Sequence, residues 1–334
     1  ELKRLQKAIK TALPFIESYT RHSTAPALSI GLFREGKRLL LRCGEDGLKH
    51  EEDARSYEYG SISKTFTGCL LAKRVREGAI SLEDSVSDYI EGLPSGFYYP
   101  TIEQLATHTA GYGETLPRPN GSVFVPLFGP KTNPFKDYRD VDTDSFAAYA
   151  RLEKKEYPPV YSNLGVTILG RVIALSEGLS VFESLERFVK DELGLKDISL
   201  GFPAEGAVCG RGESGEDCGN WQWGRSPFIC MGGLYGSASS LLDYAEIILE
   251  NKRPYFELAL EARAKSFNPG ALTGLCWQLY PQWGVAWHNG GTGCFKTFFG
   301  ISKEKRAAAC VLSNQKERGG TTPEEIGLAL LRAL

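Results

Sequence analysis

Apolar residues at the amino end of the chain follow first a helical and then a strand-like spacing. A period of three to four residues predicts an amphipathic helix within residues 1–22, with Leu5, Ile9, Leu13 and Ile16 on its buried face. Two apolar segments, 27–33 and 38–43, then flank Glu35-Gly36-Lys37, a turn sequence that predicts a β-hairpin. The amino end therefore predicts one helix and the first two strands of a sheet.

The carboxyl end returns to the strand pattern after a long, mainly helical stretch. Four strands and a closing helix are predicted at 275–280, 284–288, 297–301, 306–313 and 323–334. Strands at both ends with helices between them predict an α/β (α+β) fold: one antiparallel sheet from both termini, flanked by helices. We expect residues 1–60 and 237–334 to form the sheet-containing lobe and 61–236 to form an inserted, mainly helical lobe.

A long loop is predicted at 113–140, inside the helical lobe. It contains five prolines together with the aromatic residues Phe124, Phe128 and Phe135. A loop of this length in a compact protein is either a lid or cleft wall, or a plain surface insertion. The sequence leaves both interpretations open.

An apolar helical pattern begins just after the sequence Ser61-Ile-Ser-Lys64. A hydroxyl and an amine three residues apart lie on one side of a helix, where a neutral amine can take the proton of the serine. Ser-x-x-Lys also occurs at 302–305 and 313–316, but in polar turns. Ser61 is therefore the candidate nucleophile and Lys64 its base, and the structural alternative is a helix-capping serine.

Two further polar clusters lie at junctions between elements. Tyr161-Ser-Asn163 precedes a helix, so that the phenol can shuttle protons and the amide of Asn163 can bind a substrate; the alternative is a capping serine beside a packed tyrosine. His288-Asn289-Gly290-Gly291 lies between two predicted strands. Adjacent glycines let a substrate approach the strand edge, and the N–H of Gly291 can donate to an oxyanion opposite the N–H of Ser61.

Composition narrows the classes of function. The 39 basic and 41 acidic residues nearly cancel, so neither a nucleic acid nor a membrane surface is an expected partner, and no apolar run is long enough to span a bilayer. The eight cysteines form no Cys-x-x-Cys pair and no cluster with histidine, so no metal and no cofactor are expected. The five tryptophans, at 221, 223, 277, 283 and 287, suggest either a cleft wall or, for most of them, core packing.

The cysteines leave the redox state open. Cys209 and Cys218 flank a Gly/Glu-rich loop and can bridge, the alternative being free thiols. A turn at 302–305 would place Cys310 opposite residue 297, which leaves Cys294 too far away for a disulfide.

Taken together and in this order, the three clusters resemble the motifs of the serine beta-lactamase and penicillin-binding protein superfamily, and within it the class C beta-lactamase and D-Ala-D-Ala carboxypeptidase type. Ser61-Ile-Ser-Lys64, Tyr161-Ser-Asn163 and His288-Asn289-Gly290 match the first, second and third motifs. Leu105-Ala-Thr-His-Thr-Ala-Gly111, Gly232-Gly-Leu-Tyr-Gly-Ser-Ala-Ser239 and Val311-Leu-Ser-Asn314 are similar to secondary signatures of the family. The likeness covers roughly residues 25 to 315.

The resemblance implies a beta-lactamase-like fold and acylation of Ser61 by a peptide, amide, lactam or ester. Lys64 and Tyr161 would exchange protons, Asn163 would bind the substrate, and the amides of Ser61 and Gly291 would hold the oxyanion. The chain departs from the family at Asn289, and His288 replaces the commoner lysine, which is a permanent cation suited to a carboxylate. Peptidase, carboxypeptidase or esterase activity therefore fits at least as well as lactam hydrolysis.

Two alternatives keep the same fold. One is a penicillin-binding sensor or trap that acylates without turnover, and the other is a non-catalytic scaffold. The expected partner is a small-molecule or peptide substrate, and the expected state is a monomer. The family also implies an extracytoplasmic location, whether secreted, periplasmic or anchored at the surface.

Overall fold

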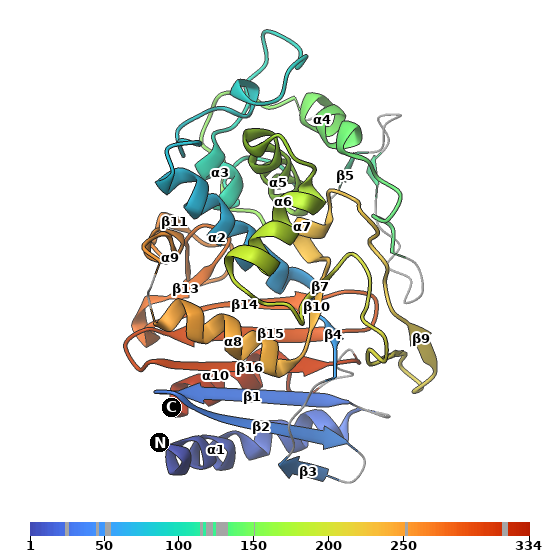
Figure 1. The fold of residues 1–334 in the computed structure, drawn as a ribbon, viewed down its shortest axis with the longest axis vertical. Coiled ribbons are helices and arrows are strands. Elements are labelled where there is room, and N and C mark those ends of the chain that lie inside the picture. The colour runs from blue at the N-terminus through green and yellow to red at the C-terminus, as the bar shows by residue number, and fades with distance from the viewer. Residues whose placement is uncertain are drawn as a thin grey trace.

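A nine-stranded sheet in which all neighbouring strands are antiparallel forms one side of the molecule (Figure 1). The computed structural model describes residues 1–23, 27–44, 47–50, 55–113, 116–117, 123–124, 133–149, 151–250, 253–315 and 320–334. In sheet order the strands are β11 (Ala264–Lys265), β12 (Leu272–Thr273), β13 (Gln278–Tyr280), β14 (Val285–Gly291), β15 (Lys296–Ser302), β16 (Ala307–Ser313), β1 (Leu28–Arg34), β2 (Lys37–Gly44) and β3 (Gly47–His50). The last long strand thus pairs with the first, which confirms the predicted sheet from both termini.

Helices cover both faces of this sheet. α1 (Leu2–Arg21) and α10 (Pro323–Ala333) pack on one face, and α8 (Ala238–Leu249) packs on the other. Along β16, Ala309 and Val311 belong to the core under α1 and α10, whereas Cys310 and Leu312 belong to the core on the side of α8. Successive side chains of a strand point to opposite faces. Because both faces are covered, every residue of β1 and β16 is buried.

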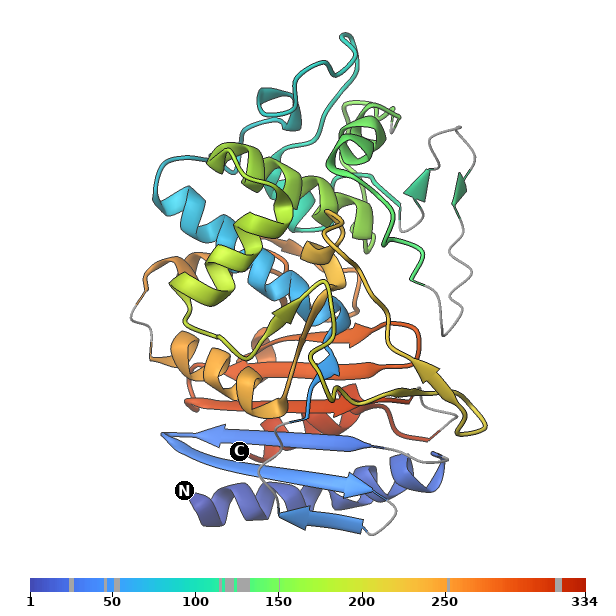
Figure 2. The ribbon, with the colours of Figure 1, turned by 45° about the vertical axis from the view of Figure 1, so that its right-hand side comes forward.

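The remaining helices form a second, mainly helical part, and α2 lies at its centre (Figure 2). Every residue of α2 from Ser63 to Ala72 is buried, because α5, α7 and α9 pack around it. The helices and helical turns of this part and its borders are η1 (Gly60–Ile62), α2 (Ser63–Arg76), η2 (Val86–Asp88), α3 (Ile102–Ala106), α4 (Asp140–Tyr149), α5 (Asn163–Glu177), α6 (Val181–Arg187), η3 (Phe188–Glu192), α7 (Ile229–Gly232), α9 (Tyr255–Ala259) and η4 (Pro281–Trp283).

Short strands connect the helical part to the sheet. β4 (Tyr57–Glu58), β10 (Leu234–Gly236) and β7 (Ser199–Leu200) form one small sheet. Two further pairs are β5 (Leu116–Pro117) with β6 (Val123–Phe124), and β8 (Gly210–Arg211) with β9 (Asp217–Gly219). Most of the predicted loop 113–140, including Phe128, lies outside the described residues, but Phe135 is described and buried.

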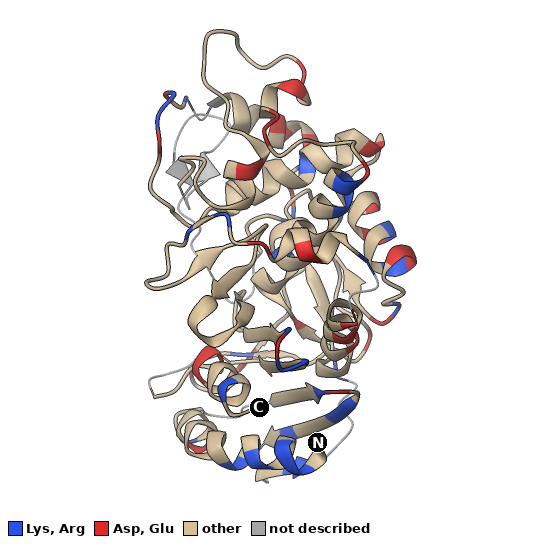
Figure 3. Ribbon diagram, turned by 90° about the vertical axis from the view of Figure 1, so that its left-hand side faces the viewer, with Lys and Arg blue, Asp and Glu red and all other residues tan. Residues whose placement is uncertain are grey.

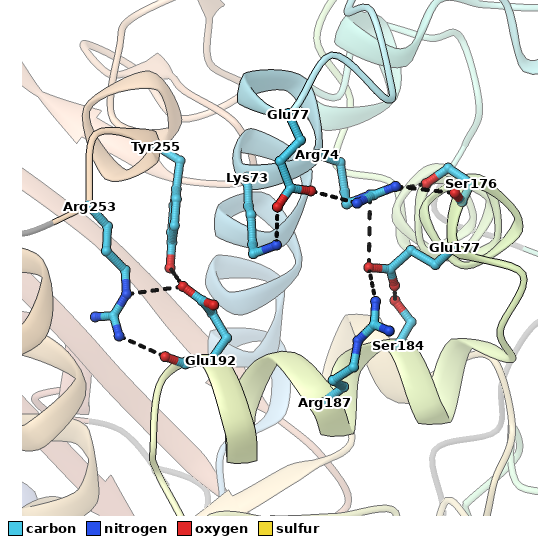
Figure 4. Close-up of polar contacts among 10 residues, drawn as sticks. All are labelled: Lys73, Arg74, Glu77, Ser176, Glu177, Ser184, Arg187, Glu192, Arg253 and Tyr255. Carbon is cyan, nitrogen blue, oxygen red and sulfur yellow. Dashed lines mark hydrogen bonds and ion pairs between the residues drawn. The ribbon is translucent and has the colours of Figure 1, made fainter.

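Ion pairs hold α2 against its neighbours at the outside of the helical part (Figure 4). The side chain of Glu177, at the end of α5, is 3% exposed and pairs with Arg74 of α2 at 3.8 Å and with Arg187 of α6 at 2.6 Å. A shielded carboxylate between two guanidinium groups is a stronger link than an exposed pair. The helix that carries Lys64 is thereby fixed relative to the helix that follows Tyr161.

Charge of both signs is spread over the sheet part and the helical part alike in the view of Figure 3. Within the described ranges, no helix is both long and apolar enough to cross a bilayer by itself. α5 and the helical segment Val181–Glu192 are long and apolar enough only when taken together, and the two are bent by 77° relative to each other.

The structure settles the two expectations about cysteines. Cys310 lies opposite Phe299 instead of residue 297, because the hairpin turn occupies 303–306, one residue later than predicted. Cys209 and Cys218 are free thiols, as are the other six cysteines. The thiol of Cys209 contacts the carboxylate of Asp217 at 2.5 Å instead of bridging.

Candidate active site

Ser61 lies in the 3₁₀ turn η1, which connects β4 to α2. Gly60 begins this turn with φ of +55°, a conformation that residues with a side chain rarely adopt. The helix α2 begins at Ser63, so it includes Lys64 and starts slightly earlier than the apolar pattern after Lys64 predicts. The turn continues directly into the helix, so that Lys64 lies three residues beyond Ser61 on the same side.

Lys64 is fully buried, and its amine lies against the hydroxyl of Ser61. Nζ donates hydrogen bonds to Ser61 Oγ at 3.0 Å and to the carbonyl oxygen of Met231 at 2.7 Å. Met231 belongs to α7, which packs on α2. The carbonyl contact fixes the amine beside the serine oxygen, at the distance that proton transfer between them requires.

Tyr161 is the second residue in contact with the hydroxyl of Ser61. Its hydroxyl donates to Ser61 Oγ at 2.7 Å, and its ring centroid lies 5.0 Å from Lys64 Nζ. The backbone holds this position because Ser162 caps α5, its side chain accepting from the N–H of Gly165 at 2.9 Å. The capping serine and the site tyrosine thus occur together, although they had been alternative interpretations of the same sequence.

Two buried imidazoles lie behind Tyr161. The ring centroids of His108 and His288 are 5.0 Å and 6.2 Å from that of Tyr161. Nδ1 of His288 lies 2.5 Å from the backbone carbonyl oxygen of Asn289. Because a carbonyl oxygen only accepts, Nδ1 carries the hydrogen and Nε2 is an acceptor. That Nε2 is buried without a partner among the described residues.

Both histidines are neutral near pH 7. Burial, and after it the charge of Lys64, lowers the pKa of His288 to about 3. The same two causes, with a smaller effect of His288, lower the pKa of His108 well below its ordinary value. The third motif therefore supplies no cation at this position.

Glycines let the backbone of β14 touch the backbone of the turn that carries Ser61. A Cβ atom on Gly290 would lie 2.0 Å from the carbonyl oxygen of Tyr59, and one on Gly60 would lie 2.6 Å from the nitrogen of Gly291. Thr297 of β15 donates to the same Tyr59 carbonyl at 2.8 Å. Only glycine fits at these positions, and the close approach brings the backbone of Gly291 beside η1.

A pocket of about 450 Å³ opens in front of Ser61. It is lined by Ser61, Phe135, Tyr161, Asn163, Trp221, Trp223, Met231, Gly232, Phe267, Asn268, Asn289, Gly290, Gly291, Thr292 and Lys296. The predicted residues thus converge from η1, the start of α5 and β14. His288, which is 1% exposed, lies behind this surface, and the side-chain amide of Asn289 donates to Glu324 of α10 at 2.8 Å.

The structure decides two interpretations of the pocket wall that the sequence left open, and it adds Phe267 to the wall, which the sequence did not indicate. Phe135, from the predicted loop, stacks on Trp223 with centroids 5.6 Å apart, so this residue of the loop does line the cleft. Trp221 and Trp223 line the pocket, whereas Trp277 and Trp287 are core residues. The Trp-x-Trp sequence between short strands was the available signal, but it does not distinguish a wall from a core.

A buried carboxyl group supports this wall from behind. Glu58 of β4 is 1% exposed, and its Oε1 accepts from the backbone N–H of Trp221 at 2.7 Å. Burial raises the pKa of Glu58 to about 8. Its position three residues before Ser61 was the only hint in the sequence.

A larger depression of about 1080 Å³ lies elsewhere, between β2 and α8, and is lined by residues that include Arg38, Ser240 and Asp243. It contains neither Ser61 nor Lys64, and Arg38 is paired there with Asp243 at 2.6 Å. We therefore assign the candidate site to the smaller pocket. Among the described residues, no group of three or more His, Cys, Asp or Glu side chains is placed to hold a metal ion.

Comparisons with known proteins identify the family to which the chain is similar. A family model described as Beta-lactamase matches residues 15–334. A beta-lactamase from Providencia stuartii is 30% identical over 197 residues, which cover 56% of this chain and 46% of that protein.

Solved structures share the fold. The octameric penicillin-binding protein homologue from Pyrococcus abyssi has a TM-score of 0.76 at 22% identity, over 96% of this chain and 76% of the other. A class C beta-lactamase from Rhodobacter sphaeroides has a TM-score of 0.72 at 21% identity, over 97% of both chains. The predicted fold is confirmed, and because the family model extends over nearly the whole chain, this protein belongs to the beta-lactamase family.

Proposed function

We propose that this protein is a serine hydrolase that transfers an acyl group from a peptide, amide, lactam or ester substrate to Ser61 and then to water. One observation carries the proposal: Lys64 Nζ, at 3.0 Å, and the hydroxyl of Tyr161, at 2.7 Å, both contact Ser61 Oγ at the wall of an open pocket. A hydroxyl between two proton-exchanging groups is the arrangement that an activated serine nucleophile requires.

In the acylation step, Ser61 Oγ attacks the substrate carbonyl carbon while its proton passes to the neutral amine of Lys64. Negative charge develops on the carbonyl oxygen, and the backbone N–H groups of Ser61 and Gly291 donate to it. The bond to the leaving group then breaks, and the leaving group takes the proton of the Tyr161 hydroxyl, which Lys64 replaces. Asn163, at the pocket wall, orients the substrate.

In the deacylation step, a water molecule attacks the acyl carbon of Ser61. Lys64 accepts one proton of this water by way of the Tyr161 hydroxyl, and the same relay returns it to Ser61 Oγ as the acyl group departs as an acid. The same residues therefore act in both halves of the reaction. No carboxylate is required to activate the water in this scheme.

Within this class, we favour peptidase, carboxypeptidase or esterase activity over lactam hydrolysis. The buried, neutral His288 does not reproduce the permanent cation that a lysine would supply. A monomeric state and an extracytoplasmic location remain part of the proposal.

The test is covalent labelling with a 4-nitrophenyl ester or a fluorescent penicillin. We expect the wild type to be labelled and Ser61→Ala to lose all labelling, with intact-mass and peptide mapping to locate the adduct. Ser302→Ala is the matched control, because Ser302 begins another Ser-x-x-Lys sequence and its Oγ accepts the backbone N–H of Lys305 at 3.4 Å. Labelling that survives in Ser61→Ala would refute the nucleophile.

A further inference from the structure

Glu58 and its cross-strand neighbour together hold the backbone of the pocket wall. Glu58 of β4 lies opposite Tyr235 of β10, and both residues are 1% exposed. Glu58 Oε1 accepts from the N–H of Trp221 at 2.7 Å, and the hydroxyl of Tyr235 donates to the carbonyl oxygen of Trp221 at 2.6 Å. Both polar groups of the Trp221 backbone are therefore fixed by side chains of one small sheet.

The second oxygen of Glu58 lies close to Thr292. Burial raises the pKa of Glu58, and the side chain of Thr292 is the strongest of the effects that lower it. Glu58 Oε2 and Thr292 Oγ1 are both buried, and neither has a hydrogen-bond partner among the described residues. Because Oε1 accepts from an N–H, the hydrogen of the protonated carboxyl group lies on Oε2, where the Thr292 oxygen is the acceptor at hand.

This carboxyl group is connected to both amides that we assign to the oxyanion. Thr292 directly follows Gly291 and lines the pocket, and Glu58 lies three residues before Ser61, in the strand that leads into η1. A negative charge on Glu58 would lie near the place where the substrate carbonyl oxygen becomes negative. Like charges repel strongly where water is excluded, so the neutral carboxyl group is the form that suits this reaction.

We propose that Glu58 is a positioning residue for the proposed acyl transfer, on which this inference rests: its neutral carboxyl group holds Trp221 and Thr292 in the pocket wall and thereby keeps the neighbouring Gly291 amide aimed at the oxyanion. Loss of the proton reverses the hydrogen bond with Thr292, because a carboxylate only accepts, and adds a negative charge near the developing oxyanion. Activity is therefore limited on the alkaline side.

The groups that face Glu58 do not titrate in the same range. Tyr235 faces it from β10, and the pKa of this phenol is raised by burial and then by the charge of Glu58, so that Tyr235 stays protonated. Asn220 and Trp221 approach it from the segment 220–223 and Thr292 from the end of β14, and all three are uncharged.

The pH profile of kcat tests this role. 4-Nitrophenyl pentanoate has no titratable group, and release of 4-nitrophenol is followed at the isosbestic wavelength of the product, with spontaneous hydrolysis subtracted. Glu58→Gln permanently mimics the neutral carboxyl group, because its amide can donate to Thr292 and accept from the N–H of Trp221. We expect kcat of the wild type relative to Glu58→Gln to fall about tenfold between about pH 6.5 and about pH 9.5, with a midpoint at about pH 8.

Variants of Thr292 test the hydrogen bond itself. Thr292→Val removes the acceptor of the Glu58 hydrogen, so it should lower kcat at about pH 6.5 by about three- to tenfold with little change in KM, and Thr292→Ser should restore kcat. Glu304→Gln, at an exposed position, is the control for charge, and its kcat relative to the wild type should not change with pH. Circular dichroism at each pH confines the comparison to folded protein.

The outcomes separate this inference from the proposed function. Coinciding pH profiles of the wild type and Glu58→Gln, with both proteins folded and hydrolysing the ester, would overturn the role of Glu58 and leave the hydrolase proposal intact. A kcat of Thr292→Val equal to that of the wild type would overturn the connection through Thr292.

A measurement without turnover covers the remaining case. If no ester acylates the wild type, the proposed function fails, and tryptophan fluorescence of Ser61→Ala is then titrated with and without Glu58→Gln. A transition at about pH 8 that Glu58→Gln removes would show that the proton of Glu58 controls the wall at Trp221. Identical titrations would overturn the positioning role as well.

Discussion

The buried carboxyl group of Glu58 makes stability depend on pH in a defined direction. Glu58 is 1% exposed, and burial raises its pKa from the ordinary 4.5 to about 8. In the unfolded chain it ionises near the ordinary value, so between these two pH values the folded protein binds one more proton than the unfolded chain. The stability that the folded protein gains by holding this proton is therefore fully present below about pH 4.5 and is lost as the pH rises to about 8.

The size of the effect follows from the same values. Each pKa unit corresponds to about 1.4 kcal/mol, so ionising Glu58 within the fold costs up to about 5 kcal/mol. Glu58→Gln removes this cost but keeps an oxygen that can accept from the N–H of Trp221. We expect the variant to gain stability relative to the wild type as the pH rises from 5 to 8.5, by a few kcal/mol in total.

The stability difference between Glu58→Gln and the wild type is measured by urea unfolding at pH 5, 6.5 and 8.5, with tryptophan fluorescence and circular dichroism as the signals. Subtracting the free energy of unfolding of the wild type from that of the variant cancels the contributions of the other titrating groups, including His108 and His288. Glu304→Gln, at an exposed position, serves as the control and should show no such trend. The reasoning fails if the stability difference between Glu58→Gln and the wild type is the same at all three pH values.

Two further substitutions test the roles of the site residues. Lys64→Arg should lower kcat by about a thousandfold, because a guanidinium group does not accept a proton near neutral pH; turnover near the wild-type level, in a variant that melts at the wild-type temperature, would contradict the assigned role. His288→Lys adds a permanent cation to the third motif, so it should raise the preference for mono-4-nitrophenyl glutarate over 4-nitrophenyl pentanoate about fivefold in kcat/KM. An unchanged preference in the folded variant would show that position 288 does not contact substrate anions.

Local sequence predicted those parts of the site that short-range geometry determines. Ser61 and Lys64 lie within one turn, and Tyr161 lies beside a helix cap, so each could be recognised from its own neighbours. The hairpin at Glu35 and Gly36 was predicted for the same reason, since both residues have positive φ in the structure. The family resemblance, confirmed by the match over residues 15–334, linked these separate signals.

Long-range packing determined what could not be predicted. Lys296 reaches the pocket because β15 pairs with β14 in a register that puts it opposite Gly291. A one-residue error in the position of the β15–β16 turn shifted the predicted partner of Cys310 by two residues. In the sequence, Glu58 looks like an ordinary glutamate of a strand, because its burial results from contacts with residues far away in the chain.

The backbone contact between Gly60 and Gly291 has a consequence for motion. Segments far apart in the chain touch there without any side chain between them, and Gly290 packs equally closely on Tyr59. Such a junction has no room for sliding or hinge opening, so the nucleophile and strand β14 behave as one rigid body. Adaptation to substrates of different size must then come from other parts of the pocket wall, which include Phe135 and Phe267.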